Sequence, residues 1–192
     1  MRHAPRPWLA ALLALAATTA LVAATAATAG QVVKEEFHEE GTFVVEDFCG
    51  VVGMDVEISF VLDVRVHIVP HGRDRLDYFL QHGTRTEVLT NLANGKQVNS
   101  LASVIEKDMR VTDNGDGTLT ILIQATGNAV LYGANGKAIA RNPGQVRFEI
   151  LVDHGGTPTD PSDDEFLEDL GLVKGSTGRS DDFCAAAVRA LS

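Results

Sequence analysis

One alternating stretch, residues 56–68, constrains the fold of this chain more than any other feature of its sequence. Every second residue in it is apolar, and the residues between are polar except Val61. Side chains of a β-strand point alternately to opposite faces, so the pattern predicts a strand with one apolar and one polar face. A helical period would scatter the same apolar residues around the axis. The break in alternation around Val61 predicts a bulge or a strong bend.

Further alternating segments follow this strand, and turn signals separate them. Asn94-Gly95 and Asn135-Gly136 are typical of tight hairpins, and residues 113–117 also read as a turn. We expect about eight strands in all, without a crossover helix between them. The predicted segments are 42–48, 56–68, 76–90, 97–106, 109–112 leading into the turn at 113–117, 119–125, 130–132 and 137–141 on either side of a hairpin, and 146–152.

This succession of strands predicts an all-β antiparallel meander. Closure into a small β-barrel would remove the unpaired edges and enclose the apolar faces. A two-sheet β-sandwich is the alternative, because the periodicity alone does not distinguish the two arrangements.

The C-terminal part, residues 155–192, differs in character from the β core. Residues 157–164 are rich in Pro and Asp and predict a surface loop. Residues 163–170 predict a short helix, because Phe166, Leu167 and Leu170 would lie on one side of it. Residues 183–191 predict a final helix with Ser180 as its N-cap.

The first residues predict export. A short basic start precedes a long uncharged run, and small residues follow at Ala27-Thr28-Ala29, which is the order of a secretory signal peptide. A retained membrane anchor is the alternative, but the run is rich in alanine and weakly apolar. We therefore expect a signal peptide over residues 1–29 and a single secreted, extracellular domain over residues 30–192, with its β core at about 42–154.

The mature chain holds two cysteines, Cys49 near its start and Cys184 near its end. Outside the cytoplasm such a pair predicts a disulfide bond, and the longer the loop it closes, the more it restricts the unfolded chain. A functional thiol is the alternative, but the sequence has no Cys-x-x-Cys motif.

The chain is acidic, with 26 Asp and Glu against 16 Lys and Arg. Such a charge repels phosphate backbones and anionic lipid headgroups, so we expect neither a nucleic-acid partner nor a membrane partner after signal cleavage. A solvated acidic surface on an exported protein accounts for the charge without an acidic function.

Several segments together resemble a family of small secreted actinobacterial proteins to which no activity is assigned. They are Asp47-Phe48-Cys49-Gly50, residues 114–121, Asn142-Pro143-Gly144-Gln145, residues 174–179 and Asp181-Asp182-Phe183-Cys184. The resemblance spans nearly all of the mature chain. It implies export and two paired cysteines, and it carries no site or ligand.

Two acidic segments have the residue types of a calcium site. In residues 113–117 the glycines do not fall where an EF-hand loop requires them, and a hairpin turn explains the composition. The densest acidic cluster includes Asp160, Asp163 and Asp164, whose carboxylates suit calcium but match no ligand spacing. We therefore predict no cofactor and keep calcium at these three residues as an open alternative. A zinc site at His67, His71 and His82 lacks a recognisable spacing as well.

Candidate catalytic residues lie on the polar face of the 56–68 strand. Glu57, Asp63 and His67 would face a barrel lumen if that face pointed inward, where acid–base chemistry is possible. Cross-strand ion pairs in water are the simpler explanation. No nucleophile elbow and no phosphate-binding glycine-rich loop is present in the sequence.

The sequence thus favours a secreted, non-catalytic binding protein. Its ligand would be a small apolar molecule in the barrel mouth or an extracellular protein partner on its surface. An extracellular barrel enzyme, cyclase-like or hydrolytic and using Glu57, Asp63 or His67, is the alternative. The oligomeric state does not follow from the sequence.

Overall fold

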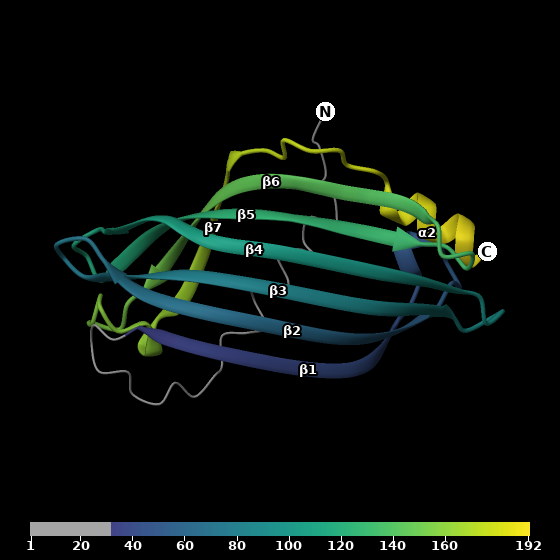
Figure 1. The fold of residues 1–192 in the computed structure, drawn as a ribbon, viewed down its shortest axis with the longest axis horizontal. Coiled ribbons are helices and arrows are strands. Elements are labelled where there is room, and N and C mark those ends of the chain that lie inside the picture. The colour runs from purple at the N-terminus through teal and green to yellow at the C-terminus, as the bar shows by residue number, and fades with distance from the viewer. Residues whose placement is uncertain (1–31) are drawn as a thin grey trace.

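Seven antiparallel strands follow one another in chain order, each hydrogen-bonded to the next, and a helix lies at one end of the sheet (Figure 1). This computed structural model describes residues 32–192, so the predicted signal peptide and its cleavage site lie outside the described residues. The strands are β1 Val33–Val45, β2 Val56–His71, β3 Leu76–Asn91, β4 Gln97–Asp113, β5 Thr118–Tyr132, β6 Ala138–Asp153 and β7 Glu165–Lys174. The helices are the short 3-10 turns η1 Phe48–Gly50 and η2 Pro161–Asp163 and the C-terminal α2 Phe183–Leu191.

The predicted antiparallel meander is confirmed, whereas the predicted barrel is not. The sheet is strongly curved, so that β7 passes behind the middle strands in Figure 1, but β1 and β7 remain its two edges. Both edges are acidic, with Glu35 and Glu39 on β1 and Glu168 and Asp169 on β7. Like charges on facing strands oppose pairing. The described strands also form one sheet instead of the two packed sheets of a sandwich.

There are seven strands where about eight were expected, because neighbouring segments join into longer strands, among them residues 119–125 and 130–132 in β5, while β7 adds a strand that was not expected. Residues 109–112 continue β4 through a bulge between Asp108 and Arg110. Residues 138–141 and 146–152 belong to one strand, β6. A strand can absorb such an irregularity without ending, because a bulge leaves a single residue unpaired.

The bulge predicted around Val61 is absent. β2 pairs without interruption with β1 and with β3 along this region, where Val61 lies opposite Glu40 and Thr86. Val61 therefore points to the polar face as a normal strand residue. The backbone of β2 is regular at this point, and the break in the apolar–polar alternation arises only because Val61 is an apolar residue on the polar face.

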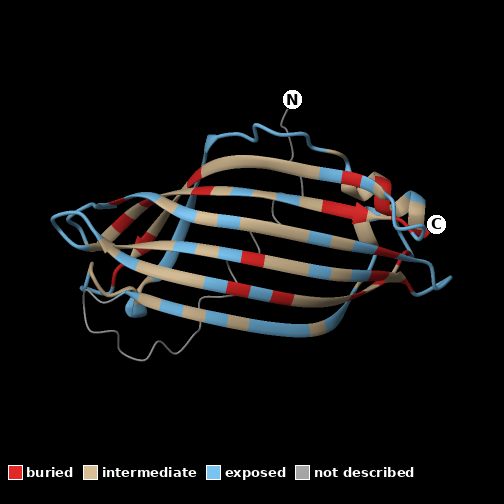
Figure 2. Cartoon of the chain, viewed as in Figure 1, coloured by how far each residue is buried: buried red, intermediate tan, exposed pale blue. Residues whose placement is uncertain are grey.

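The two faces of the sheet differ in what they pack against. We call the face that carries Val56, Leu62 and Val64 the inner face and the opposite one the outer face. Buried residues gather on the inner face beside α2 and again at the far end of the sheet, as Figure 2 shows. Between these two cores Leu62 and Val64 are 6% and 5% exposed.

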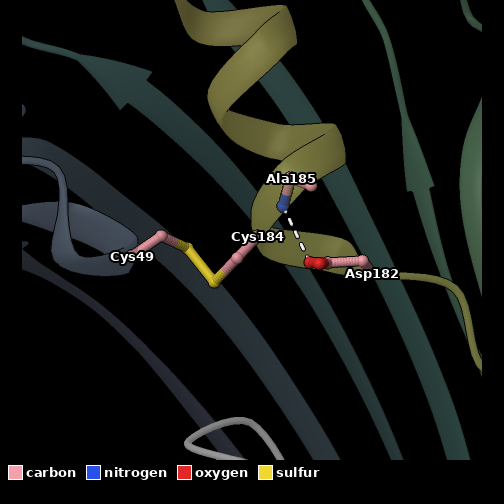
Figure 3. Close-up of a disulfide and its surroundings, with 4 residues drawn as sticks. All are labelled: Cys49, Asp182, Cys184 and Ala185. Atoms are coloured by element: carbon pink, nitrogen blue, oxygen red, sulfur yellow. Dashed lines mark hydrogen bonds between the residues drawn. A yellow bond between two sulfur atoms is a disulfide. The ribbon is translucent and has the colours of Figure 1, made fainter.

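Helix α2 closes the first core. It buries Ala186, Ala187 and Leu191 against the ends of the strands, and the Leu191 carbonyl oxygen accepts a hydrogen bond from the buried Asn91 amide at 3.0 Å. The N-cap is Asp182 and not Ser180 as predicted, since the Asp182 carboxylate accepts from the Ala185 N–H at 2.8 Å (Figure 3). No helix within residues 32–192 has the length and apolarity needed to cross a bilayer.

The predicted disulfide is confirmed and ties α2 to the segment before β2. Cys49 in η1 and Cys184 in the first turn of α2 are bonded, with their Cα atoms 5.5 Å apart (Figure 3). The bond links two points that are 135 residues apart in the sequence.

The helix predicted over residues 163–170 is wrong, because most of this segment belongs to strand β7. β7 pairs with β6 through three register shifts, which leave Leu167, Leu170 and Val173 without a paired partner. These bulges recur every third residue, and this spacing imitates a helical pattern in the sequence. The free edge of β6 supplied the hydrogen-bond partners that made a strand the better solution.

After β7 the chain continues along the same edge of β6 before it reaches α2. The Thr177 N–H donates to the Gln145 carbonyl at 3.2 Å, and the Asp181 N–H donates to the Arg141 carbonyl at 3.1 Å. A Cβ atom on Gly178 would overlap the Pro143 carbonyl oxygen. The close approach of the two backbones therefore requires glycine at this position.

We expect loss of the disulfide to destabilise the fold strongly. Opening so long a loop returns conformational entropy to the unfolded chain and lowers its free energy by about 4–5 kcal/mol in the chain-entropy model. The double variant Cys49→Ser/Cys184→Ser should unfold at a clearly lower denaturant concentration than the oxidised protein. Reductant should lower the midpoint of the wild type and leave that of the double variant unchanged. Equal midpoints for the oxidised wild type and the double variant would contradict the expectation.

We expect Gly178→Ala to loosen the segment between β7 and α2. The free energy of unfolding should fall by about 1–3 kcal/mol, the usual range for overpacking. Gly175→Ala is the matched control, because nothing lies within 4 Å of a Cβ atom there. Thermal unfolding measures the stability, and hydrogen exchange of the Asp181 N–H reports on the segment itself. Equal exchange rates in the two variants would show that the close approach at Gly178 is unimportant.

Candidate functional site

A shallow hollow of about 600 Å³ crosses the outer face from β1 to β5. Its lining residues form three neighbouring rows across the strands. By the alternation of a strand, the two flanking rows direct their side chains to the outer face and the row between them to the inner face. It is lined by Glu40, Gly41, Thr42, Ser59, Phe60, Val61, Thr86, Glu87, Val88, Asn99, Ser100, Leu101 and Tyr132. We call it the outer hollow.

The strand register explains how these side chains come together. Thr42, Ser59, Val88, Asn99 and Tyr132 are successive partners from β1 to β5. The second row, two residues further along each strand, runs from Glu40 to Leu101 through Val61 and Thr86. Paired residues of an antiparallel sheet point to the same face, so both rows lie on the outer surface.

The outer hollow combines exposed apolar side chains with small hydrogen-bonding groups. Val88 and Leu101 are 37% and 36% exposed. The Thr42 and Ser59 hydroxyls bond each other at 3.0 Å. Within residues 32–192 the structure shows no hydrogen bond of the Thr86, Asn99 or Tyr132 side chains. Such groups can contact a ligand without first losing a protein partner.

A second group of polar residues occupies the middle of the inner face, on β3 and β4. The Arg85 Nε lies 2.8 Å from the Glu87 Oε1, and both side chains are 21% exposed. The Arg85 guanidinium also lies over the Phe60 ring, 4.6 Å from its centroid. Gly41 leaves room for that ring, since a Cβ atom there would lie 3.0 Å from it. The ring and the carboxylate thus stabilise the cation in a largely buried place.

Two carboxyl groups on β4 continue this inner group. Glu106 accepts a hydrogen bond from the Gln81 amide at 2.5 Å, and burial raises the pKa of its carboxyl. Burial also raises the pKa of Asp108 to about 7, opposed by the Phe79 N–H at 2.8 Å and supported by the Glu106 charge. Near neutral pH the Asp108 carboxyl can therefore either donate or accept a proton.

The predicted catalytic residues lie on the other side of the sheet. Glu57, Asp63 and His67 alternate with the inner residues of β2 and so belong to the outer face. Asp63 is exposed and pairs with His38 at 2.8 Å, which raises the pKa of that imidazole. The structure does not place these three residues in the outer hollow or with the buried carboxyls, and their catalytic role stays a prediction.

The acidic residues considered for calcium have local structural partners. Asp160 caps η2 by accepting from the Ser162 N–H at 3.1 Å, and Asp163 accepts from the Thr157 hydroxyl at 2.6 Å. Burial first, and then the charge of Asp163, raises the pKa of Asp164 to about 7. In the described part of the chain no three His, Cys, Asp or Glu side chains are arranged to hold a metal ion.

Sequence reasoning missed the residues of both groups. Val61 was the available signal for the outer hollow, since it is the apolar exception on the polar face of its strand. For the inner group no comparable signal existed, because Arg85 and Glu87 look like ordinary polar residues of a strand until the register shows which face they share with Leu62.

Comparison with known proteins found no matching family model, no matching curated protein and no matching solved structure. The resemblance to secreted actinobacterial proteins stays a prediction.

We expect Asp108 to make the stability of the protein fall as the pH rises. An exposed Asp has a pKa of about 3.9, whereas that of Asp108 is about 7. Between these values the folded protein binds the additional proton, so this stabilisation is complete below the lower pKa and is lost as the pH rises through the higher one. Asp108→Asn should reduce the stability difference between pH 5 and pH 8 by about 1–3 kcal/mol.

Denaturant unfolding at the two pH values measures this difference. Asp116→Asn is the control, because Asp116 is exposed and a hydrogen bond from Thr118 lowers the pKa of its carboxyl. That variant should show the wild-type dependence between pH 5 and pH 8. The expectation fails if Asp108→Asn leaves the pH dependence as it is in the wild type.

Proposed function

We propose that this chain is an exported, non-catalytic binding protein whose ligand lies in the outer hollow. The observation that carries the proposal is the hollow itself, with exposed apolar side chains and hydrogen-bonding groups on one rigid sheet. Its volume of about 600 Å³ falls in the range of ligand sites, about 300–1,000 Å³. A row of strand side chains is also a better-ordered platform than a loop.

The charges around the outer hollow restrict the ligand. Its lining contains no Lys, Arg or His, and Glu40 is the charged side chain that the strand alternation directs toward it. An anionic ligand would meet no compensating charge there, in a chain whose formal charge is −10. We therefore propose a neutral ligand.

The version of the proposal with an apolar ligand in a barrel mouth depends on β1 approaching β7. Neither the open sheet nor the charged side chains of Arg85 and Glu87 on the inner face favour it. The other version expected from the sequence, an extracellular protein partner on the surface, shares only its location on the outside of the sheet with the neutral ligand proposed here.

An enzyme is the second candidate, and one observation favours it. The neighbouring inner-face carboxyls of Glu106 and Asp108 both have raised pKa values, and such groups are more frequent at active sites than elsewhere. These two residues replace Glu57, Asp63 and His67 as the stronger candidates for acid–base chemistry. Conversion of a bound compound by the protein would favour this function.

We expect a ligand retained from the medium to depend on Leu101. Leu101→Gln places a polar amide in the outer hollow. Ile105→Gln is the matched control, because Ile105 lies on the same face of β4, is 46% exposed and does not line the hollow. Native mass spectrometry of the exported protein should find bound mass on the wild type and on Ile105→Gln, and much less on Leu101→Gln.

Two results would contradict this proposal. One is equal retention by both variants, which would place the site elsewhere. The other is the absence of retained mass together with unchanged NMR signals of the hollow residues when concentrated culture medium is added to the protein.

A further inference from the structure

We infer that the ligand of the outer hollow is a neutral, linear saccharide lying across the strands; this inference rests on the function proposed above.

The shape of the outer hollow suits an extended molecule. It reaches from β1 to β5, across four strand-to-strand intervals. With strands about 4.8 Å apart, this length is about 19 Å. The interval between strands is close to the length of one hexose unit in an extended chain. Successive sugar rings can therefore meet equivalent positions on successive strands.

The lining repeats two kinds of group along this direction. Hydroxyl and amide side chains, among them Thr42, Thr86 and Asn99, can donate to and accept from sugar hydroxyls. Val88 and Leu101 offer exposed apolar surface for the C–H faces of the rings, and Tyr132 adds an aromatic side chain at the β5 end. The Glu40 carboxylate at the β1 end can accept two sugar hydroxyls.

Other extended polymers fit this surface less well. A nucleic acid requires basic side chains, and the lining has none. An extended peptide usually adds to a sheet edge, where it pairs its backbone, and the outer hollow lies on a face. A lipid chain would remain mostly in water, because the hollow is shallow and open and has hydroxyl side chains in its lining.

The probes for the test are cellohexaose, fully N-acetylated chitohexaose, xylohexaose and mannohexaose, with hexagalacturonate as the acidic control. Isothermal titration calorimetry should find binding of at least one neutral hexaose and weaker binding of hexagalacturonate. With the neutral sugar that binds, affinity should rise from the disaccharide to the tetrasaccharide and then level off, because longer chains exceed the length of the hollow.

Single variants locate the site. Thr86→Val removes a hydroxyl and preserves the shape of the side chain, so we expect a three- to tenfold loss of affinity, about the effect of one hydrogen bond. Thr84→Val is the matched control on the same face of β3, outside the hollow, and should bind like the wild type. Leu101→Gln should also weaken binding, and Ile105→Gln should not.

The outcomes separate this inference from the proposed function. If no hexaose binds but Leu101→Gln still loses a ligand retained from the medium, the saccharide is wrong and the outer hollow remains a binding site. If neither effect occurs, both proposals fail. Sugar binding that is unchanged by Thr86→Val and Leu101→Gln, or equally strong with hexagalacturonate, would also overturn the inference.

Discussion

The unbroken register of β2 with both of its neighbours is the constraint on which the rest of this structure depends. β2 pairs along its whole length with β3 and along 13 of its residues with β1. A slip of one residue would exchange the two faces of the strand, so that Val56 and Val64 would meet water and Asp63 would meet the core. Burial of the apolar face against α2 and the curved sheet therefore fixes the register, and the register in turn decides which side chains become neighbours.

The same constraint produces both of the polar groups described above. On the outer face it aligns hydroxyl, amide and aliphatic side chains from five strands into one hollow. On the inner face it places Arg85 beside Phe60 and brings Gln81 opposite Glu106. Buried ionisable groups of this kind usually cost stability compared with apolar residues. They lie between two apolar cores, and the second, enzymatic candidate function depends on their two carboxyls, Glu106 and Asp108.

The two edges of the sheet stay unpaired because of the residues that β1 and β7 carry. The curved sheet stays open between β1 and β7, where β1 carries inward-facing glutamates and β7 is interrupted by bulges. Both features are known to keep edge strands from pairing with other strands. They allow exposed apolar residues such as Phe166 and Leu172 to remain on β7 without a regular edge that invites association.

How far the sequence predicts this protein depends on whether a local pattern has one physical meaning. Three patterns fit a single local structure, and the protein contains all three: the alternation of β2, the Asn-Gly turns and the amphipathic C-terminal helix. The pattern of the β7 segment fits two structures, because apolar residues at every third position are compatible with a helix and with a repeatedly bulged strand. Only the free edge of β6 selected the strand. Ser180 and Asp182 were equally suitable caps by residue type, and the path of the chain along β6 decided for Asp182.

The sequence by itself therefore determined the strands from β2 to β6, their antiparallel direction and the pairing of Cys49 with Cys184, since periodicity, turn residues and a single cysteine pair are local or unambiguous signals. It did not determine β7, or the start of β1 at Val33, where residues 42–48 were expected as the first strand. The tertiary structure alone decided that the sheet stays open, which carboxyls are buried and which side chains share the outer hollow. These properties depend on the register between strands far apart in the chain, and no single stretch of sequence contains that information.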